Sequence, residues 1–147
     1  MKLILLPIFL MLFNINLQEY DYEKIDDSVI IIINDLYCKD CLESISKVQS
    51  IWKEKYKTVV IAKSKYYESS TNYSAKFFKL KINYDEIYFV KSDKKNYNKS
   101  FQIGSFNIFK TPNIIIKSNG KEKILNYDTL FKDMNPNRIK KYISNEL

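Results

Sequence analysis

Residues 28–33 constrain the fold of this chain more than any other segment. They read Ser-Val-Ile-Ile-Ile-Ile, so five β-branched side chains follow one another without a polar residue between them. A strand that alternates apolar and polar residues buries one face, whereas a strand that is apolar throughout must be covered on both faces, as in a parallel sheet. The run therefore predicts a central strand of an α/β domain.

The segment after this strand has the periodicity of an amphipathic helix. From Cys41 onward, apolar residues recur at intervals of three and four, and the charged residues fall largely on the other side. The apolar positions are Leu42, Ile45, Val48, Trp52 and Tyr56. Two cysteines, Cys38 and Cys41, lie at the start of the predicted helix, where the strand gives way to it.

Further strands and helices are expected to alternate along the chain. The expected strands are residues 58–62, 86–90 and 113–117, with Ser118-Asn119-Gly120 as the turn of a hairpin into residues 121–125. A polar loop is expected at residues 63–72, and helices are expected at residues 73–80, at residues 94–101 and from Asn135-Pro136 onward. This order predicts an α/β sandwich whose sheet is parallel at first and antiparallel at its end.

Composition and charge exclude several classes of function. The chain has 147 residues, no histidine and two cysteines. Nucleophiles activated by imidazole, histidine metal sites and scaffolds with several disulfides are therefore excluded. The formal charge is +7, but the lysines are scattered among acidic residues. We therefore expect a solvated basic surface and no nucleic-acid binding.

The first residues have the pattern of a signal peptide. Lys2 is followed by 11 apolar residues, and the polar Asn14 then ends the run. This run is shorter than the roughly 20 residues that a membrane-spanning helix needs. We expect residues 1–17 to be a signal peptide or an N-terminal anchor and residues 18–147 to form the domain, with the protein exported to the periplasmic or cell-envelope side.

The cysteines are separated by two residues, in the sequence Cys38-Lys39-Asp40-Cys41. Free N–H groups and the dipole at a helix N-terminus stabilise a thiolate, so Cys38 is predicted to be the nucleophile that forms a mixed disulfide with a partner protein. Cys41, one helical turn later, is predicted to resolve that intermediate by attacking Cys38. Two other uses of the pair stay open: an inert disulfide, and a zinc site completed by carboxylates or a second protomer.

In these features the sequence resembles the thioredoxin superfamily, and more narrowly the exported TlpA/ResA-like thiol-disulfide oxidoreductases. The resemblance covers about residues 28–125 and rests on two blocks. The first is Asp35-Leu36-Tyr37-Cys38-Lys39-Asp40-Cys41, at the join of strand and helix. The second is Phe106-Asn107-Ile108-Phe109-Lys110-Thr111-Pro112-Asn113, which precedes an apolar strand and Asn119-Gly120 and looks like the family's cis-proline loop.

The resemblance implies a fold and a set of site residues. The fold would be a thioredoxin-like three-layer sandwich, with a central mixed sheet flanked by helices and with residues 63–90 as the extra helix and strand of TlpA-like members. Pro112 would be cis and pack beside the cysteines. The substrate-binding residues would be Thr111 and Pro112 together with Tyr37, Lys39 and Asp40. The resemblance implies no metal and no cofactor.

The expected function is to reduce or exchange disulfides of partner proteins through the Cys38–Cys41 dithiol. The substrate would be a disulfide-containing protein, and a membrane thiol donor would supply the electrons. An oxidase or isomerase would differ in reduction potential and not in residues. The alternative from another class is a noncatalytic thioredoxin-fold binding protein, in which the disulfide is structural and the Thr111-Pro112 loop binds a peptide or another envelope protein.

Overall fold

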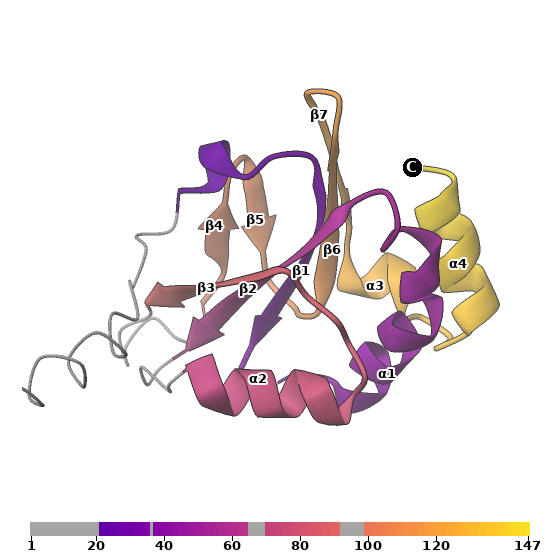
Figure 1. The fold of residues 1–147 in the computed structure, drawn as a ribbon, viewed down its shortest axis with the longest axis horizontal. Coiled ribbons are helices and arrows are strands. Elements are labelled where there is room, and N and C mark those ends of the chain that lie inside the picture. Colours follow the sequence, from indigo (N-terminus) through magenta and orange to yellow (C-terminus); the bar gives the residue numbers. More distant parts are fainter. Residues whose placement is uncertain (1–20, 36, 65–69, 92–98) are drawn as a thin grey trace, which may run out of the picture.

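The computed structural model describes residues 21–35, 37–64, 70–91 and 99–147. A five-stranded sheet in the order β3-β2-β1-β6-β7 lies at its centre (Figure 1). β1 pairs in parallel with β2, and β2 with β3, whereas β6 is antiparallel to both β1 and β7. The strands are β1 (Ser28–Asn34), β2 (Lys57–Ser64), β3 (Glu86–Lys91), β6 (Asn113–Ser118) and β7 (Lys121–Leu125). The predicted mixed sheet, with residues 28–33 in its central strand, is confirmed.

β1 is apolar throughout because both faces of the sheet are covered. Val29, Ile31 and Ile33 belong to one buried cluster, and Ile30 and Ile32 belong to a second cluster on the opposite face. The side chains of β2 and β6 alternate between the two clusters in the same way. The sheet therefore separates two apolar cores, as its continuous β-branched sequence requires.

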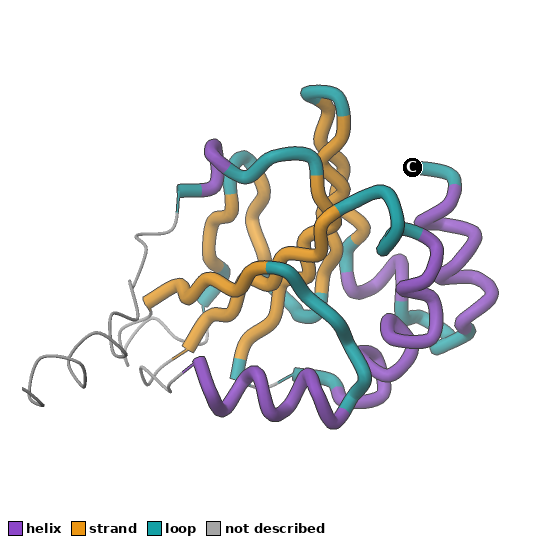
Figure 2. The backbone as a smooth tube through the Cα atoms, viewed as in Figure 1, coloured by secondary structure: helices purple, strands orange, loops and turns teal. Residues whose placement is uncertain are grey.

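Helices cover one face of the sheet. They are α1 (Lys39–Val48), α2 (Ser70–Lys79) and α4 (Pro136–Ser144), with the short α3 (Tyr127–Leu130) before α4. Figure 2 shows α1, α2 and α4 gathered along the lower and right sides of the strands. Their buried side chains form a single cluster with β1 and include Leu42, Ile45, Tyr73, Phe77, Ile139 and Ile143. α2 leads into β3, which adds an edge strand to the sheet beside β2.

The other face is covered by a β-hairpin, which was not predicted from the sequence. β4 (Phe101–Ile103) and β5 (Phe106–Ile108) pair with each other, and Ile103 and Ile108 point into the second core. Gly104 forms the turn with a φ of 55°, and a Cβ there would lie 2.4 Å from the Tyr22 ring, so the turn needs glycine. The expected helix at 94–101 is wrong at its end, where Phe101 starts β4; residues 94–98 lie outside the described residues.

The observed order of layers therefore differs from the predicted one, in which helices flank the sheet on both faces. In the described part of the chain, α1, α2 and α4 lie on one face, and the β4–β5 hairpin with a 3-10 turn, η1 (Tyr22–Lys24), lies on the other. The α/β sandwich is confirmed at this coarser level. No helix among the described residues is both long enough and apolar enough to cross a membrane.

The predicted helix from Cys41 to Tyr56 ends earlier than expected. α1 stops at Val48, and a 3-10 turn, η2 (Gln49–Ile51), follows it. The buried Gln49 side chain bonds the backbone of Asn83, both as donor and as acceptor, and donates to Thr58 at 3.2 Å. These bonds fix the chain where it turns toward β2. The expected loop at 63–72 is shorter as well, because β2 continues to Ser64 and α2 begins at Ser70.

Candidate functional site

Cys38 occupies the N-cap of α1. Its backbone is extended, with φ −78° and ψ 107°, while its carbonyl oxygen accepts the first helical hydrogen bond from Leu42 N–H at 3.1 Å. Its Sγ accepts a hydrogen bond from the backbone N–H of Cys41 at 3.3 Å. The sulfur therefore takes the place that a serine or aspartate oxygen commonly has at a helix start. A negative charge on Cys38 would be stabilised there by this N–H group and by the helix dipole.

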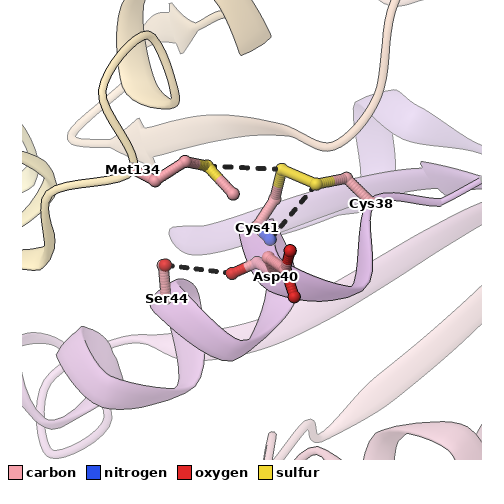
Figure 3. Close-up of a disulfide and its surroundings, with 5 residues drawn as sticks. All are labelled: Cys38, Asp40, Cys41, Ser44 and Met134. Carbon is pink, nitrogen blue, oxygen red and sulfur yellow. Dashed lines mark hydrogen bonds between the residues drawn. A yellow bond between two sulfur atoms is a disulfide. The ribbon is translucent and has the colours of Figure 1, made fainter.

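The two cysteines form a disulfide but are not equally accessible. Cys38 is partly buried, whereas Cys41 has 0% of its surface exposed. Figure 3 shows both sulfur atoms at the first turn of α1, with Ser44 donating a hydrogen bond to the Asp40 carbonyl oxygen below them. Cys38 lines a surface groove, and Cys41 is enclosed by the core of the helical face.

The second block of the sequence lies beside the disulfide. The Thr111-Pro112 peptide bond is cis, as the resemblance implied, and both residues are buried. The Asn113 side chain fixes this loop, because its Nδ2 donates to the Lys110 carbonyl and its Oδ1 accepts from the backbone N–H of Tyr127, both at 2.6 Å. The start of β6 thus ties the loop to the start of α3.

A groove of about 440 Å³ joins the two blocks. The residues that line it are Asn34, Tyr37, Cys38, Phe109, Lys110, Thr111 and Tyr127. Three of the predicted site residues, Tyr37, Cys38 and Thr111, therefore meet in one groove. Lys39 and Asp40 lie outside its lining; both are exposed, and Lys39 pairs with Glu43 at 3.6 Å.

Two buried oxygen atoms belong to residues that line the groove and have no hydrogen-bond partner among the described residues. They are Oδ1 of Asn34, at the end of β1, and Oγ1 of Thr111, whose residue is 7% exposed. Buried polar atoms in native proteins nearly always have a partner, and leaving one unpaired is costly. Both atoms are therefore left unsatisfied beneath the surface of the groove.

Phe109 is a groove residue to which the sequence reading assigned no role. It is 76% exposed, although most aromatic side chains of this size lie in the cores. Its position just before Thr111-Pro112 could have indicated a place in the site. The sequence alone does not show that its ring points outward. Next to it, Lys110 donates to Asp128 at 2.9 Å, and this hydrogen bond raises the pKa of Lys110.

Tyr37 connects the groove to α2. Lys76 of α2 lies over the Tyr37 ring, with its Nζ 5.4 Å from the ring centroid, and also over Tyr73 at 4.9 Å. The Tyr73 hydroxyl in turn donates a hydrogen bond to Asp35, just after β1. The helix inserted between β2 and β3 therefore supports the residue that precedes Cys38.

Met134 is a second neighbour of the disulfide that the sequence reading missed. Its Sδ lies 3.9 Å from Sγ of Cys41, across 93 positions of the chain (Figure 3). Nothing in the local sequence indicates this contact, because it depends on how α4 packs against α1.

The zinc alternative needs ligands beyond the two cysteines. In the part of the chain that the structure describes, no group of three or more His, Cys, Asp or Glu side chains is placed to hold a metal ion. Comparison of the chain with known protein families, curated proteins and solved structures finds no match. The arrangement of sheet, helices and Cys-x-x-Cys disulfide is compatible with a thioredoxin-like fold.

Proposed function

We propose that this protein is an exported thiol-disulfide oxidoreductase with a thioredoxin-like fold, in which Cys38 and Cys41 exchange electrons with disulfides of partner proteins. The observation that carries the proposal is the unequal environment of the two sulfur atoms. Cys38 is accessible, lies at a helix N-terminus and accepts a backbone N–H, while Cys41 is fully buried. An inert disulfide has no need of this asymmetry, whereas an exchange reaction does.

The first step is attack by Cys38. In the dithiol form its thiolate would be stabilised by the Cys41 N–H and the helix dipole. It attacks one sulfur of a partner disulfide, forming a bond between Cys38 and that sulfur and releasing the other partner sulfur as a thiolate. Because the Cys38 sulfur is the accessible one, the mixed disulfide forms there.

The second step is attack by Cys41. Its thiol loses a proton and its sulfur bonds to Cys38 Sγ, which breaks the mixed disulfide and releases the second partner sulfur. The protein pair is thereby oxidised by two electrons and the partner disulfide is reduced by two. The Cα atoms of the two cysteines lie 5.2 Å apart in one chain, so the return attack is intramolecular and short in range.

The groove would hold the partner segment. Tyr37 and Thr111 line the groove beside Cys38, and the exposed Phe109 ring offers an apolar contact to an extended peptide. Pro112, Lys39 and Asp40 are proposed to contribute as the sequence neighbours of Thr111 and Cys38. A membrane thiol donor would re-reduce the disulfide, consistent with the predicted signal peptide or anchor at residues 1–17.

The TlpA/ResA-like branch is the relationship that we favour within this proposal. The support for it is α2 and β3, which lie between β2 and the Thr111-Pro112 loop in the chain and add an edge strand to the sheet. Residues 63–90 were expected to supply such a helix and strand. The contact of Lys76 with Tyr37 gives this segment a direct link to the site.

A redox titration of the full chain tests the proposed function. The protein is equilibrated in graded mixtures of reduced and oxidised dithiothreitol or glutathione, free thiols are counted by alkylation, and circular dichroism monitors the fold. Reversible titration of a folded protein is expected, and a midpoint near roughly −270 mV would indicate a reductase and one near roughly −120 mV an oxidase. A disulfide that opens only when the protein unfolds would contradict catalysis and favour the noncatalytic binding protein.

A further inference from the structure

Met134 contacts the buried member of the cysteine pair. Its thioether sulfur lies 3.9 Å from Cys41 Sγ, and its side chain packs against the apolar cluster that contains Cys41. In Figure 3 the Met134 side chain reaches toward the disulfide from the loop that faces the start of α1. The methionine therefore covers Cys41 on the side away from Cys38.

The loop holds Met134 in a backbone conformation that it would not adopt by itself. Its φ is 52°, in the left-handed region that is unfavourable for residues other than glycine. Asp133, just before it, accepts hydrogen bonds from Arg138 at 2.8 Å and from the N–H of Asn135 at 3.4 Å. The side chain of Asn135 caps α4 by accepting the N–H of Asn137 at 3.0 Å. Such a conformation persists only where neighbouring contacts fix it, as they do here.

The charge of Asp133 keeps this loop fastened at neutral pH. Its hydrogen bond to the Arg138 guanidinium lowers the pKa of Asp133 below the ordinary carboxyl value. The same contact raises the pKa of Arg138. Both groups therefore remain charged at neutral pH, and their ion pair joins the residue before Met134 to the first turns of α4.

A thioether has a specific effect on a neighbouring thiol. It is apolar and flexible, it cannot donate a hydrogen bond, and its sulfur is at most a weak acceptor. In the dithiol form it therefore offers nothing that stabilises a thiolate on Cys41, and it excludes the water that would. A protonated, unreactive thiol is the form that this contact favours.

We propose that Met134 is a positioning residue that shields Cys41 in the dithiol form, so that Cys38 attacks first and Cys41 reacts only within the mixed disulfide. This inference rests on the proposed function. No bond to Met134 forms or breaks. The proton of the Cys41 thiol passes to the departing partner sulfur as Cys41 Sγ bonds to Cys38 Sγ, so the partner sulfur leaves as a thiol.

The test uses Cys41 as the single thiol of the full chain. In a Cys38→Ser background, the rate of alkylation of Cys41 by iodoacetamide is measured at a series of pH values, with and without Met134→Gly. Glycine accepts the left-handed backbone, so this change removes the cover without straining the loop. We expect alkylation at neutral pH to be about tenfold faster in Met134→Gly, with the rate profile displaced toward lower pH.

Met134→Leu is the matched control, because leucine keeps an apolar cover of similar volume without the sulfur. Its alkylation rate is expected to stay within about twofold of the parent. If Met134→Gly leaves the rate and its pH profile unchanged, the inference is wrong; equal acceleration in both variants would overturn shielding as its cause. Should Met134→Gly fail to fold by circular dichroism, Met134→Ala replaces it with the same expected outcomes.

These outcomes are independent of catalysis. Alkylation of a single thiol requires no partner and no redox cycle, so it tests Met134 even in a protein whose disulfide does not turn over. Failure of the reversible redox titration overturns the proposed function, whatever Met134 does. Reversible titration together with an unchanged Cys41 rate overturns only the role of Met134.

Discussion

The two sides of the disulfide differ in almost every physical respect. On the side of Cys38 there is a groove with the exposed Phe109 and the unpaired oxygens of Asn34 and Thr111. On the side of Cys41 there is a fully enclosed sulfur covered by Met134 and by the core of the helical face. Only two residues of sequence separate the two cysteines.

In the proposed two-step exchange, this difference in packing would set the order of the steps. Both cysteines have the same chemistry, and both lie in the first turn of one helix. Their surroundings distinguish them: the groove and the Cys41 N–H lie beside the Cys38 sulfur, and apolar side chains lie around Cys41. Changes on either side should therefore have different and separable effects.

Replacement of each cysteine should give the largest difference between the two sides. Cys38→Ser is expected to abolish reduction of a disulfide protein such as insulin, with a loss of at least about a hundredfold, because it removes the nucleophile. Cys41→Ser should also stop turnover but should accumulate a mixed disulfide that non-reducing electrophoresis detects. Equal trapping by both variants would contradict the assignment of Cys38 as the accessible nucleophile.

The enclosure of Cys41 should depend on the core beneath it. Ile45 lies one turn further along α1 and is fully buried in the same cluster as Cys41. Ile45→Ala is expected to lower the free energy of unfolding by about 2–5 kcal/mol, since it leaves a cavity under the helix. Urea denaturation of the oxidised protein measures this loss.

Lys47→Ala is the control for the same helix. Lys47 is exposed in the last turn of α1, and its replacement should change the free energy of unfolding by no more than about 0.5 kcal/mol. A loss of similar size in both variants would mean that α1 is not anchored through its apolar face.

The open side should contribute to partner binding and little to stability. Phe109→Ser removes an exposed ring from the groove, and kcat/KM for a disulfide protein is expected to fall by about five- to thirtyfold, as for the loss of a large apolar contact. The midpoint of urea unfolding should stay unchanged. Steady-state kinetics with insulin as the substrate provide the measurement.

Phe78→Ser provides the matched comparison, because Phe78 is 84% exposed on α2 and does not line the groove. The same chemical change there should leave kcat/KM within about twofold. If both variants lose activity equally, the groove does not select the partner.

The sequence predicted the helical face of the fold better than the opposite face. Residues 28–33 and the spacing of Leu42 and Ile45 identify the central strand and α1, because burial on one or both sides leaves a direct periodic signal. The hairpin at Phe101–Ile103 and Phe106–Ile108 was missed although Gly104 and the alternating apolar residues around it are a hairpin signal. Its strands are only three residues long, so the pattern competes poorly with a helical interpretation.

Some residues of the candidate site were likewise predicted from the sequence, and others were missed. Cys38, Cys41, Tyr37 and Thr111 were predicted because they lie in contiguous motifs. The contact of Met134 with Cys41 and the outward orientation of Phe109 depend on tertiary packing between segments far apart in the chain. No local sequence pattern encodes either feature.

The smallest expected effect concerns the unpaired hydroxyl of Thr111. Thr111→Val preserves the shape of the side chain and removes an oxygen that is buried without a partner among the described residues. We expect the free energy of unfolding to rise by about 0.5–1 kcal/mol, because the desolvation cost of the hydroxyl disappears. If partner binding uncovers this oxygen and gives it a hydrogen bond, kcat/KM should fall by about three- to tenfold in the more stable variant. Urea unfolding and steady-state kinetics of one preparation measure both quantities. A gain in stability without a loss of activity would show that Thr111 positions the loop only through its backbone, and a variant less stable than the parent would show that the hydroxyl has a partner in the folded protein.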